Sequence, residues 1–335
     1  MSRRHRSSAG CAVGTLPPEA TVGRADHSYS IRVQAPYRLD LTVNVLRRLS
    51  SNRVDVLTPE GEYLRVLGNV AEPVIVHARQ TSPETLSILI EGDRREHPRP
   101  LALVRRMLGL EVDLTRFYHA ASGIAWLHPL VLRMRGVKPP RYPTLWEACV
   151  NAIVFQQVSL VAASTIMGRL TLGLGEPVEH KGVRLYHFPG IEQVRRASDR
   201  LLRGAGLSAA KLATLRRVAD ALEEGALDEA RMEESPSPEA AALLRGIKGI
   251  GPWTAAVILL RGLGRLDVFP TNDTSVARNL ALVGGSAPQD VTPVLEALGP
   301  ERGMLYYHLL LARLDAGAGL GRVAASAHQA RRSRA

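Results

Sequence analysis

The feature that most constrains this chain is a glycine-rich turn between two predicted helices. Gly246, Gly249 and Gly251 lie close together, and Pro252 follows them directly. Glycine permits a tight backbone turn, and proline is favoured at the first position of a helix. We therefore predict a helix closed by Gly246 in the left-handed conformation, a hairpin, and a second helix from Pro252 to about Arg261. The free backbone N–H groups at the start of that second helix would attract an anion such as a phosphodiester.

A carboxylate follows this predicted phosphate site along the chain. The extended stretch 267–270 leads to Asn272 and Asp273, at the start of another predicted helix. Aspartate is a favoured helix-capping residue, so capping alone could account for Asp273. A carboxylate beside a bound phosphodiester could also stabilise positive charge that develops on a sugar. We interpret the nearby Asp267 as a loop or cap residue.

The stretch GIGPWTA, followed by a loop and Asp273, resembles the helix-hairpin-helix (HhH-GPD) DNA glycosylase superfamily. Three further stretches look like its 3-methyladenine DNA glycosylase II (AlkA-type) branch, in the same order: YSIRVQAPYRLDL, TLWEACVNAIVFQQVSLVAAS and GMLYYHLLLARL. The resemblance covers roughly residues 28–315. It implies a monofunctional DNA N-glycosylase of base excision repair, which flips out alkylated purines such as 3-methyladenine and hydrolyses their N-glycosidic bond.

The resemblance implies chemical roles for four residues. Asp273 would be the catalytic residue. Family members that also cleave the DNA backbone carry a lysine where this chain has Trp253, so this departure implies hydrolysis without lyase activity. Trp253, Val257 and Thr274 would line the base pocket, with the indole stacked on an electron-poor alkylated purine. Val257 and Thr274 stand where alkylbase enzymes often have aromatic residues, which implies a more open pocket or one suited to other bases.

The resemblance also implies a set of DNA contacts. Gln156 and Gln157, at a predicted helix break, match the family position that wedges into the base stack, with Gln157 at the tip. Ser159 follows them and can cap the next helix. The backbone N–H groups of Gly249 and Gly251 would hold phosphate. The other expected DNA-binding residues are Thr254 and Lys248 in the hairpin region, with Lys211 and Arg278 as secondary contacts.

The charge balance favours a polyanionic partner. The 335 residues include 43 Lys or Arg against 32 Asp or Glu, a formal net charge of +11. No apolar run approaches the length of a membrane span, and no apolar stretch follows the arginine-rich start to make a signal peptide. We therefore expect a cytoplasmic, nucleoid-associated monomer that binds double-stranded DNA with damaged bases, and no membrane partner.

Cysteine content limits the cofactors. Cys11 and Cys149 are the two cysteines of the chain, too few for a four-cysteine zinc site or an iron–sulfur cluster. We expect no metal site and no cofactor, with a monovalent cation at the hairpin carbonyls as the one exception to consider.

Hydrophobic patterning predicts a mainly α protein with an N-terminal α+β domain. Residues 28–112 contain short alternating runs typical of an antiparallel sheet, with helices at 39–49 and 100–110. Residues 113–317 are predicted to form a two-lobed helical HhH-GPD glycosylase core, in which 172–189 is a loop. Residues 1–27 are predicted to be a disordered leader, and 318–335 a basic tail.

Two other functions fit the same residues. Helix-hairpin-helix units also occur in proteins that hold DNA without acting on it, so the chain could be a non-catalytic DNA-binding module. A glycosylase for deaminated bases such as uracil or hypoxanthine is the second alternative. Substitution of Asp273 separates the first alternative from an enzyme, and a panel of lesion duplexes separates the second.

Overall fold

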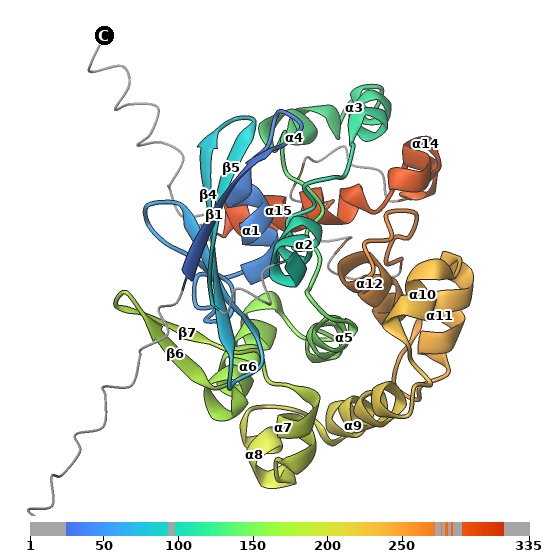
Figure 1. The fold of residues 1–335 in the computed structure, drawn as a ribbon. Helices are drawn as coiled ribbons and strands as arrows, with labels where there is room; N and C mark the ends of the chain where they lie inside the picture. Colours follow the sequence, from blue (N-terminus) through green and yellow to red (C-terminus); the bar gives the residue numbers. More distant parts are fainter. Residues whose placement is uncertain are drawn as a thin grey trace, which may run out of the picture.

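A computed structural model describes residues 25–92, 98–271, 276, 279–280, 283 and 290–317. An N-terminal antiparallel sheet lies against a larger helical body, as Figure 1 shows. The predicted fold class is confirmed. Among the described residues, no helix is both long enough and apolar enough to cross a membrane.

Five strands form the N-terminal sheet in the order β1-β5-β4-β3-β2, and every neighbouring pair is antiparallel. The strands are β1 (Ala25–Arg32), β2 (Val56–Leu57), β3 (Glu62–Gly68), β4 (Pro73–Ser82) and β5 (Thr85–Gly92). The alternating runs predicted these strands because successive side chains point to opposite faces of a sheet. β1 begins at Ala25, so the expected leader 1–27 extends three residues too far.

One helix, α1, lies between β1 and β2, and the other helices follow the five-stranded sheet in sequence. They are α1 (Leu39–Arg47), α2 (Pro98–Met107), α3 (Thr115–Ser122), α4 (His128–Arg133), α5 (Leu145–Val154), α6 (Leu160–Leu174), α7 (Ile191–Arg196), α8 (Asp199–Gly204), α9 (Ala209–Glu223), α10 (Glu229–Glu234), α11 (Ser237–Arg245), α12 (Pro252–Gly262), α14 (Thr292–Leu298) and α15 (Met304–Ala316), with the short 3₁₀ helix η2 (Gly299–Glu301). Asp273, Thr274 and Arg278 lie outside the described residues.

Side-chain caps start the helices that position the site. Thr144 accepts a hydrogen bond from the Glu147 backbone N–H at 3.1 Å and begins α5. Ser159 begins α6 in the same way, as predicted. Each cap satisfies one N–H group that the first helical turn leaves without a partner, which is worth about 1 kcal/mol.

Two hydrophobic cores join the sheet to the helical body. The larger core packs one face of the sheet and α1 against α5, α9 and α12. The second core packs Leu41 and Val45 of α1 against α3, α4, α14 and α15. Both cores therefore draw on residues before and after position 112, and the sheet is fixed to the helices that carry the candidate site.

A β-hairpin occupies the stretch that was predicted to be a loop. α6 continues to Leu174, and β6 (Pro177–His180) then pairs with β7 (Val183–Tyr186). Lys181 and Gly182 form the turn, both with positive φ, the conformation that two-residue hairpin turns require. Leu185 of β7 packs with Leu64, Val66 and Ile75 on the outer face of the sheet. The prediction of a loop at 172–189 was wrong.

Candidate DNA interface and active site

The predicted helix-hairpin-helix forms from α11, the turn 246–251 and α12. Gly246 keeps a right-handed helical conformation with φ −60°, so the predicted left-handed cap at this residue was wrong. The left-handed position lies three residues later at Gly249, where φ is +107°. Glycine adopts this conformation without the steric cost that other residues incur.

Gly249 also lies too close to α9 for any side chain. A Cβ atom at this position would lie 2.0 Å from Oγ1 of Thr214. Arg217, one turn further along α9, donates from Nη1 to the carbonyl oxygen of Lys248 at 3.2 Å. α9 therefore supports the hairpin from beneath, and a Cβ atom at position 249 would displace the turn.

The start of α12 keeps its backbone donors free. Gly251 is the N-cap residue and has no side chain to satisfy the N–H groups of the first turn. Within the described part of the chain, the N–H groups of Gly249 and Gly251 donate no hydrogen bond. Lys248 is exposed beside them. Free N–H groups at the positive end of a helix are suited to a phosphate.

Gln156 connects this hairpin to the end of α5. Its Nε2 donates to the carbonyl oxygen of Gly249 at 3.0 Å and to Oγ1 of Thr254 at 2.7 Å. Gln156 is therefore a strut between the two segments, although the sequence placed it in the wedge. The Thr254 side chain is buried and its hydroxyl accepts from Gln156, so the backbone N–H of Thr254 is the group suited to the predicted phosphate contact.

Gln157 lies at the tip of the segment that Gln156 anchors. The residue is exposed and adopts a left-handed conformation with φ +53°, which costs a residue with a side chain about 1–2 kcal/mol. Val158 and Val161 beside it are 39% and 65% exposed. Ser159 is also exposed, and its hydroxyl caps α6. The segment thus presents an exposed, partly apolar tip next to the hairpin.

Trp253 and Val257 lie on α12, one turn apart. Trp253 is half-buried and packs against the larger core, whereas Val257 is buried within it. These are the two expected base-pocket residues that lie within the described part of the chain, and burial leaves Val257 almost no accessible surface. Thr274, the third expected pocket residue, and Asp273, the expected catalytic residue, are outside the described residues, and so is Arg278.

Lys211 has a structural contact in place of an exposed DNA-facing position. Its Nζ donates to the carbonyl oxygen of Val154 at 2.8 Å, at the C-terminal end of α5. Burial lowers the pKa of Lys211. A cation at the negative end of a helix stabilises that end. Lys211 therefore holds the end of α5, just before the Gln156–Gln157 segment.

The expected monovalent cation would be bound by backbone carbonyl oxygens of the turn 246–251. The carbonyl oxygens of Lys248 and Gly249 already accept hydrogen bonds from Arg217 and Gln156. The guanidinium of Arg217 also brings a positive charge next to the first of them. Each of these two carbonyls keeps a second lone pair, so the monovalent cation at the hairpin stays a prediction.

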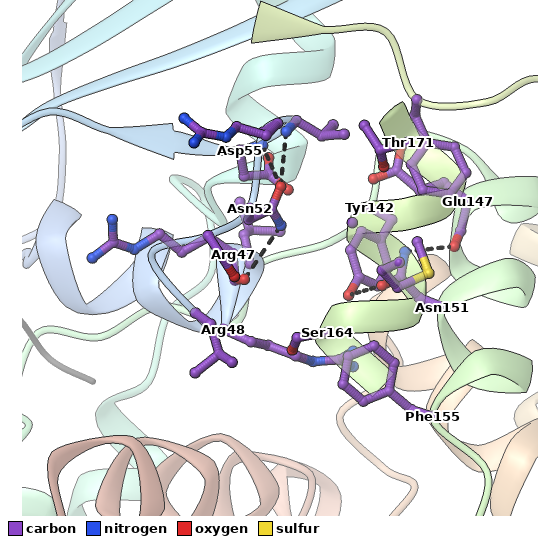
Figure 2. Close-up of a pocket in the computed structure, with 18 residues that line it drawn as sticks. Arg47, Arg48, Asn52, Asp55, Tyr142, Glu147, Asn151, Phe155, Ser164 and Thr171 are labelled. Carbon is purple, nitrogen blue, oxygen red and sulfur yellow. Dashed lines mark hydrogen bonds between the residues drawn. The ribbon is translucent and has the colours of Figure 1, made fainter. Parts of the chain in front are cut away.

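Sequence reasoning missed a pair of buried arginines behind this surface. Arg48, which ends α1 with φ +59°, lies with its guanidinium carbon 3.5 Å from the ring centre of Phe155. Figure 2 shows these two side chains together in a small cavity lined by α1, α5 and α6. Arg261 of α12 is fully buried and donates to the carbonyl oxygen of Val45 at 2.9 Å. Arg48 therefore lies beside the residue that precedes the Gln156–Gln157 segment, whereas Arg261 contacts Val45 and the Tyr142 ring.

These arginines keep unused donors. Arg48 Nη1 and Arg261 Nε and Nη1 are buried and have no hydrogen-bond partner among the described residues. Burial lowers the pKa of Arg48. Burying a charged group without a full set of hydrogen bonds costs folding free energy. The folded state tolerates this cost only where the surrounding residues hold the group in place. Their signal in the sequence was weak because arginine is normally a surface residue.

A buried ion-pair network fixes the sheet to α5. Arg65 of β3 contacts Asp55 at 2.6 Å and Glu147 of α5 at 2.5 Å. Tyr63 donates a further hydrogen bond to Asp55 at 2.8 Å. Burial raises the pKa of Glu147. Because all four side chains are buried, the network orients α5, which carries the Gln156–Gln157 segment at its end.

Comparison with known proteins identifies the superfamily of this chain. Residues 150–299 match the model of the HhH-GPD superfamily base excision DNA repair protein. The match begins within α5 and contains the Gln156–Gln157 segment, the whole hairpin and Asp273. This part of the chain, which holds the candidate site, therefore matches the HhH-GPD superfamily.

Individual HhH-GPD proteins resemble longer stretches of the chain. It is 30% identical over 259 residues to a probable bifunctional transcriptional activator/DNA repair enzyme AlkA of Mycobacterium tuberculosis, covering 76% of this chain and 50% of that protein. It is 26% identical over 289 residues to DNA-3-methyladenine glycosylase 2 of Escherichia coli, covering 84% and 96%. The chain thus spans about half the length of the mycobacterial relative.

A solved structure supports the same superfamily. The 3-methyladenine DNA-glycosylase from Archaeoglobus fulgidus superposes with a TM-score of 0.72 at 26% sequence identity. The superposition covers 86% of this chain and 99% of the archaeal one. The N-terminal sheet and the helical HhH-GPD core therefore occur together in both proteins.

Proposed function

We propose that this HhH-GPD protein is a DNA glycosylase of base excision repair that hydrolyses the N-glycosidic bond of alkylated purines such as 3-methyladenine. The observation that carries the proposal is the strut from Gln156 to Gly249. It joins an anion-binding hairpin to the exposed tip at Gln157 on one surface. The names of the relatives in Escherichia coli and Archaeoglobus fulgidus supply the substrate class.

The chemistry needs the target base outside the duplex. A base inside the stack cannot be reached, so the enzyme must extrude it and support the gap. The free N–H groups at Gly249 and Gly251 would hold a phosphate of the damaged strand while Gln157 fills the gap. Because Gln156 fixes the distance between these two points, the extruded nucleotide would be placed reproducibly near the start of α12.

Asp273 would carry the hydrolysis. Departure of the base leaves positive charge on the deoxyribose, and a carboxylate beside the anomeric carbon stabilises that charge or deprotonates the attacking water. A purine alkylated at a ring nitrogen is already cationic and leaves without a second acid. Asp267 is not needed as that second acid. Its carboxylate accepts a hydrogen bond from the Ser237 hydroxyl at 2.9 Å at the start of α11.

The proposal includes hydrolysis without strand cleavage. A lyase needs an amine that attacks the sugar carbon, and the residue at that position of α12 is Trp253. Trp253 would instead stack on the electron-poor base. We further propose that the protein acts as a monomer on double-stranded DNA, in the cytoplasm at the nucleoid.

A panel of lesion duplexes tests the proposal. The purified protein is incubated with matched duplexes that carry 3-methyladenine, 7-methylguanine, hypoxanthine, uracil or no lesion, and released bases are quantified. We expect release of the alkylated purines above the others. Preferential release of hypoxanthine or uracil would favour the deaminated-base alternative, and release of no base from any duplex would favour the DNA-binding module.

A further inference from the structure

Two histidines and a glutamate lie close together on the outer face of the sheet. They are far along the chain from the turn 246–251 of the helix-hairpin-helix. His77 of β4 and Glu91 of β5 are diagonal neighbours on that face, and His180 reaches them from the end of β6. His77 Nε2 lies 3.0 Å and His180 Nε2 3.6 Å from Glu91 Oε1. All three ligand atoms lie within 4.8 Å of one another. We call these residues the His77–Glu91–His180 cluster.

The cluster is buried, and its imidazole nitrogens lack hydrogen bonds. The side chains of His77, His180 and Glu91 are 5%, 9% and 11% exposed. Nε2 of His77 and Nε2 of His180 have no hydrogen-bond partner among the described residues, although both lie close to the Glu91 carboxylate. A buried polar atom without a partner is costly, and here two of them point at the same anionic oxygen.

Glu62 orients His77 from the other side of the ring. Its carboxylate lies 3.2 Å from His77 Nδ1. A proton on Nδ1 that is donated to Glu62 leaves the lone pair of Nε2 directed at Glu91. A carboxylate that accepts from the second nitrogen of an imidazole is the usual arrangement behind a metal-binding histidine. A lone pair facing a carboxylate oxygen at 3.0 Å is repulsive unless a cation lies between them.

Lys181 supplies a cation at the edge of the cluster. Its Nζ lies 2.9 Å from Glu91 Oε1, whereas its side chain is 66% exposed. An exposed lysine on a hairpin turn can leave this contact at little cost, because exposed ion pairs contribute at most about 1 kcal/mol.

We propose that the His77–Glu91–His180 cluster binds a divalent transition-metal ion, Zn²⁺ foremost, as a structural clip between the sheet and the β6–β7 hairpin. Two imidazoles and one carboxylate are an established zinc donor set. Metal–ligand bonds of about 2.0–2.1 Å place tetrahedral donors about 3.4 Å apart, close to the two separations from Glu91 Oε1. Water would take the fourth position as Lys181 turns outward.

The metal ion would act on α6, the helix that begins beside the exposed tip at Gln157. The β6–β7 hairpin directly follows α6, and α6 begins next to Gln157. Among the described residues, a small hydrophobic cluster around Leu185, the ring contact of His180 with His77 and the exposed ion pair of Lys181 with Glu91 otherwise hold the β6–β7 hairpin on the sheet. A metal ion would therefore hold the far end of α6 to the sheet, a role separate from the proposed glycosylase activity.

Zinc binding by the full chain tests this inference. The protein, without an affinity tag, is treated with a chelator, and Zn²⁺ is titrated in competition with a chromophoric chelator while thermal unfolding is followed in parallel. We expect one high-affinity Zn²⁺ per chain and a higher unfolding temperature, because a ligand that binds only the folded state stabilises it. His180→Gln, at the end of β6, should weaken binding by about 10–100-fold or more.

Two further variants separate a metal site from an ion-pair network. Lys181→Ala removes the competing ammonium group, so it should tighten Zn²⁺ binding if the metal site exists. His119→Ala changes an exposed histidine on α3 and should leave binding unchanged. Absence of stoichiometric binding in the wild type, unchanged binding in His180→Gln, or weaker binding in Lys181→Ala would each overturn the proposal.

Discussion

The side-chain amide of Gln156 donates to the carbonyl oxygen of Gly249 across 3.0 Å, although the two residues are 93 positions apart in the chain. The same nitrogen donates to Oγ1 of Thr254 at 2.7 Å. One side chain thereby fixes the exposed tip at Gln157 relative to the turn that is proposed to bind phosphate. The relative position of these two parts decides where an extruded nucleotide would lie.

Substitution of Gly249 tests the geometry of the turn. Gly249→Ala should lower the free energy of unfolding by about 2 kcal/mol, because φ is +107° and the added Cβ would lie 2.0 Å from Thr214 Oγ1. Affinity for abasic-site DNA should fall with it. Gly251→Ala is the matched control, since nothing lies within 4 Å of its added Cβ and its stability should stay within about 0.5 kcal/mol of the wild type. Urea unfolding measures both, and equal losses would contradict this account of the turn.

Gln157 and Gln156 should behave differently despite being neighbours. Gln157→Ala should reduce excision from fully paired lesion duplexes by about tenfold, which corresponds to about 1.4 kcal/mol, and spare excision from single-stranded substrate. Gln156→Ala removes both hydrogen bonds of the strut and should impair excision from either substrate. Single-turnover rates on the two substrates provide the test. A Gln157→Ala variant with equal losses on both would argue against the wedge.

The lysines predict the outcome of covalent trapping. The chain contains four lysines, of which Lys138 and Lys211 donate to the carbonyl oxygens of Val112 and Val154. Lys181 contacts Glu91, and Lys248 is exposed in the hairpin. Borohydride added during reaction should therefore yield no covalent protein–DNA product, whereas a bifunctional glycosylase/lyase run in parallel should yield one. A product that disappears in Lys248→Ala would show that the proposed lack of lyase activity is wrong.

His308 predicts a loss of stability in mild acid. Its Nδ1 donates to the Met304 carbonyl oxygen at 2.8 Å, and burial lowers its pKa from 6.5 to about 4. The unfolded chain then binds more protons than the folded chain between these values. The stabilisation is complete above pH 6.5 and is lost as the pH falls towards 4, by about 3 kcal/mol in total.

A neutral replacement isolates this contribution. His308→Gln can keep the hydrogen bond to Met304 without titrating, so the difference in unfolding free energy between wild type and variant should change with pH. Glu147 acts in the opposite sense, because its raised pKa favours the folded state at low pH, and it cancels in that difference. Urea unfolding at pH 7.5, 6 and 5 measures the difference, and a constant value would contradict the assignment.

Local patterns predicted much of the fold and some of the site. Alternation predicted the antiparallel sheet, and Ser159 predicted the start of α6 because its capping is a local interaction. The β6–β7 hairpin was missed because strands of four residues around Lys181 and Gly182 resemble a loop. The left-handed glycine was placed at Gly246, since local sequence does not record that Thr214 approaches Gly249 from a distant helix.

The contacts that sequence could not predict are mostly long-range. Gln156 was expected in the wedge, but its partner is 93 residues away. Lys211 was expected on DNA, yet the end of α5 lies within reach of its amine. Arg48 and Arg261 were missed because burial of a guanidinium depends on the packing of several helices. Such pairings follow from the fold as a whole and leave no periodic signal.

The most direct test concerns Asp273, the residue on which the proposed hydrolysis depends. In Asp273→Asn the side chain keeps its shape and loses its negative charge. Release of 3-methyladenine from a lesion duplex should fall by about 1,000-fold, whereas affinity for abasic-site DNA should stay within about threefold of the wild type. Excision by Asp273→Asn at a rate close to that of the wild type would contradict the account.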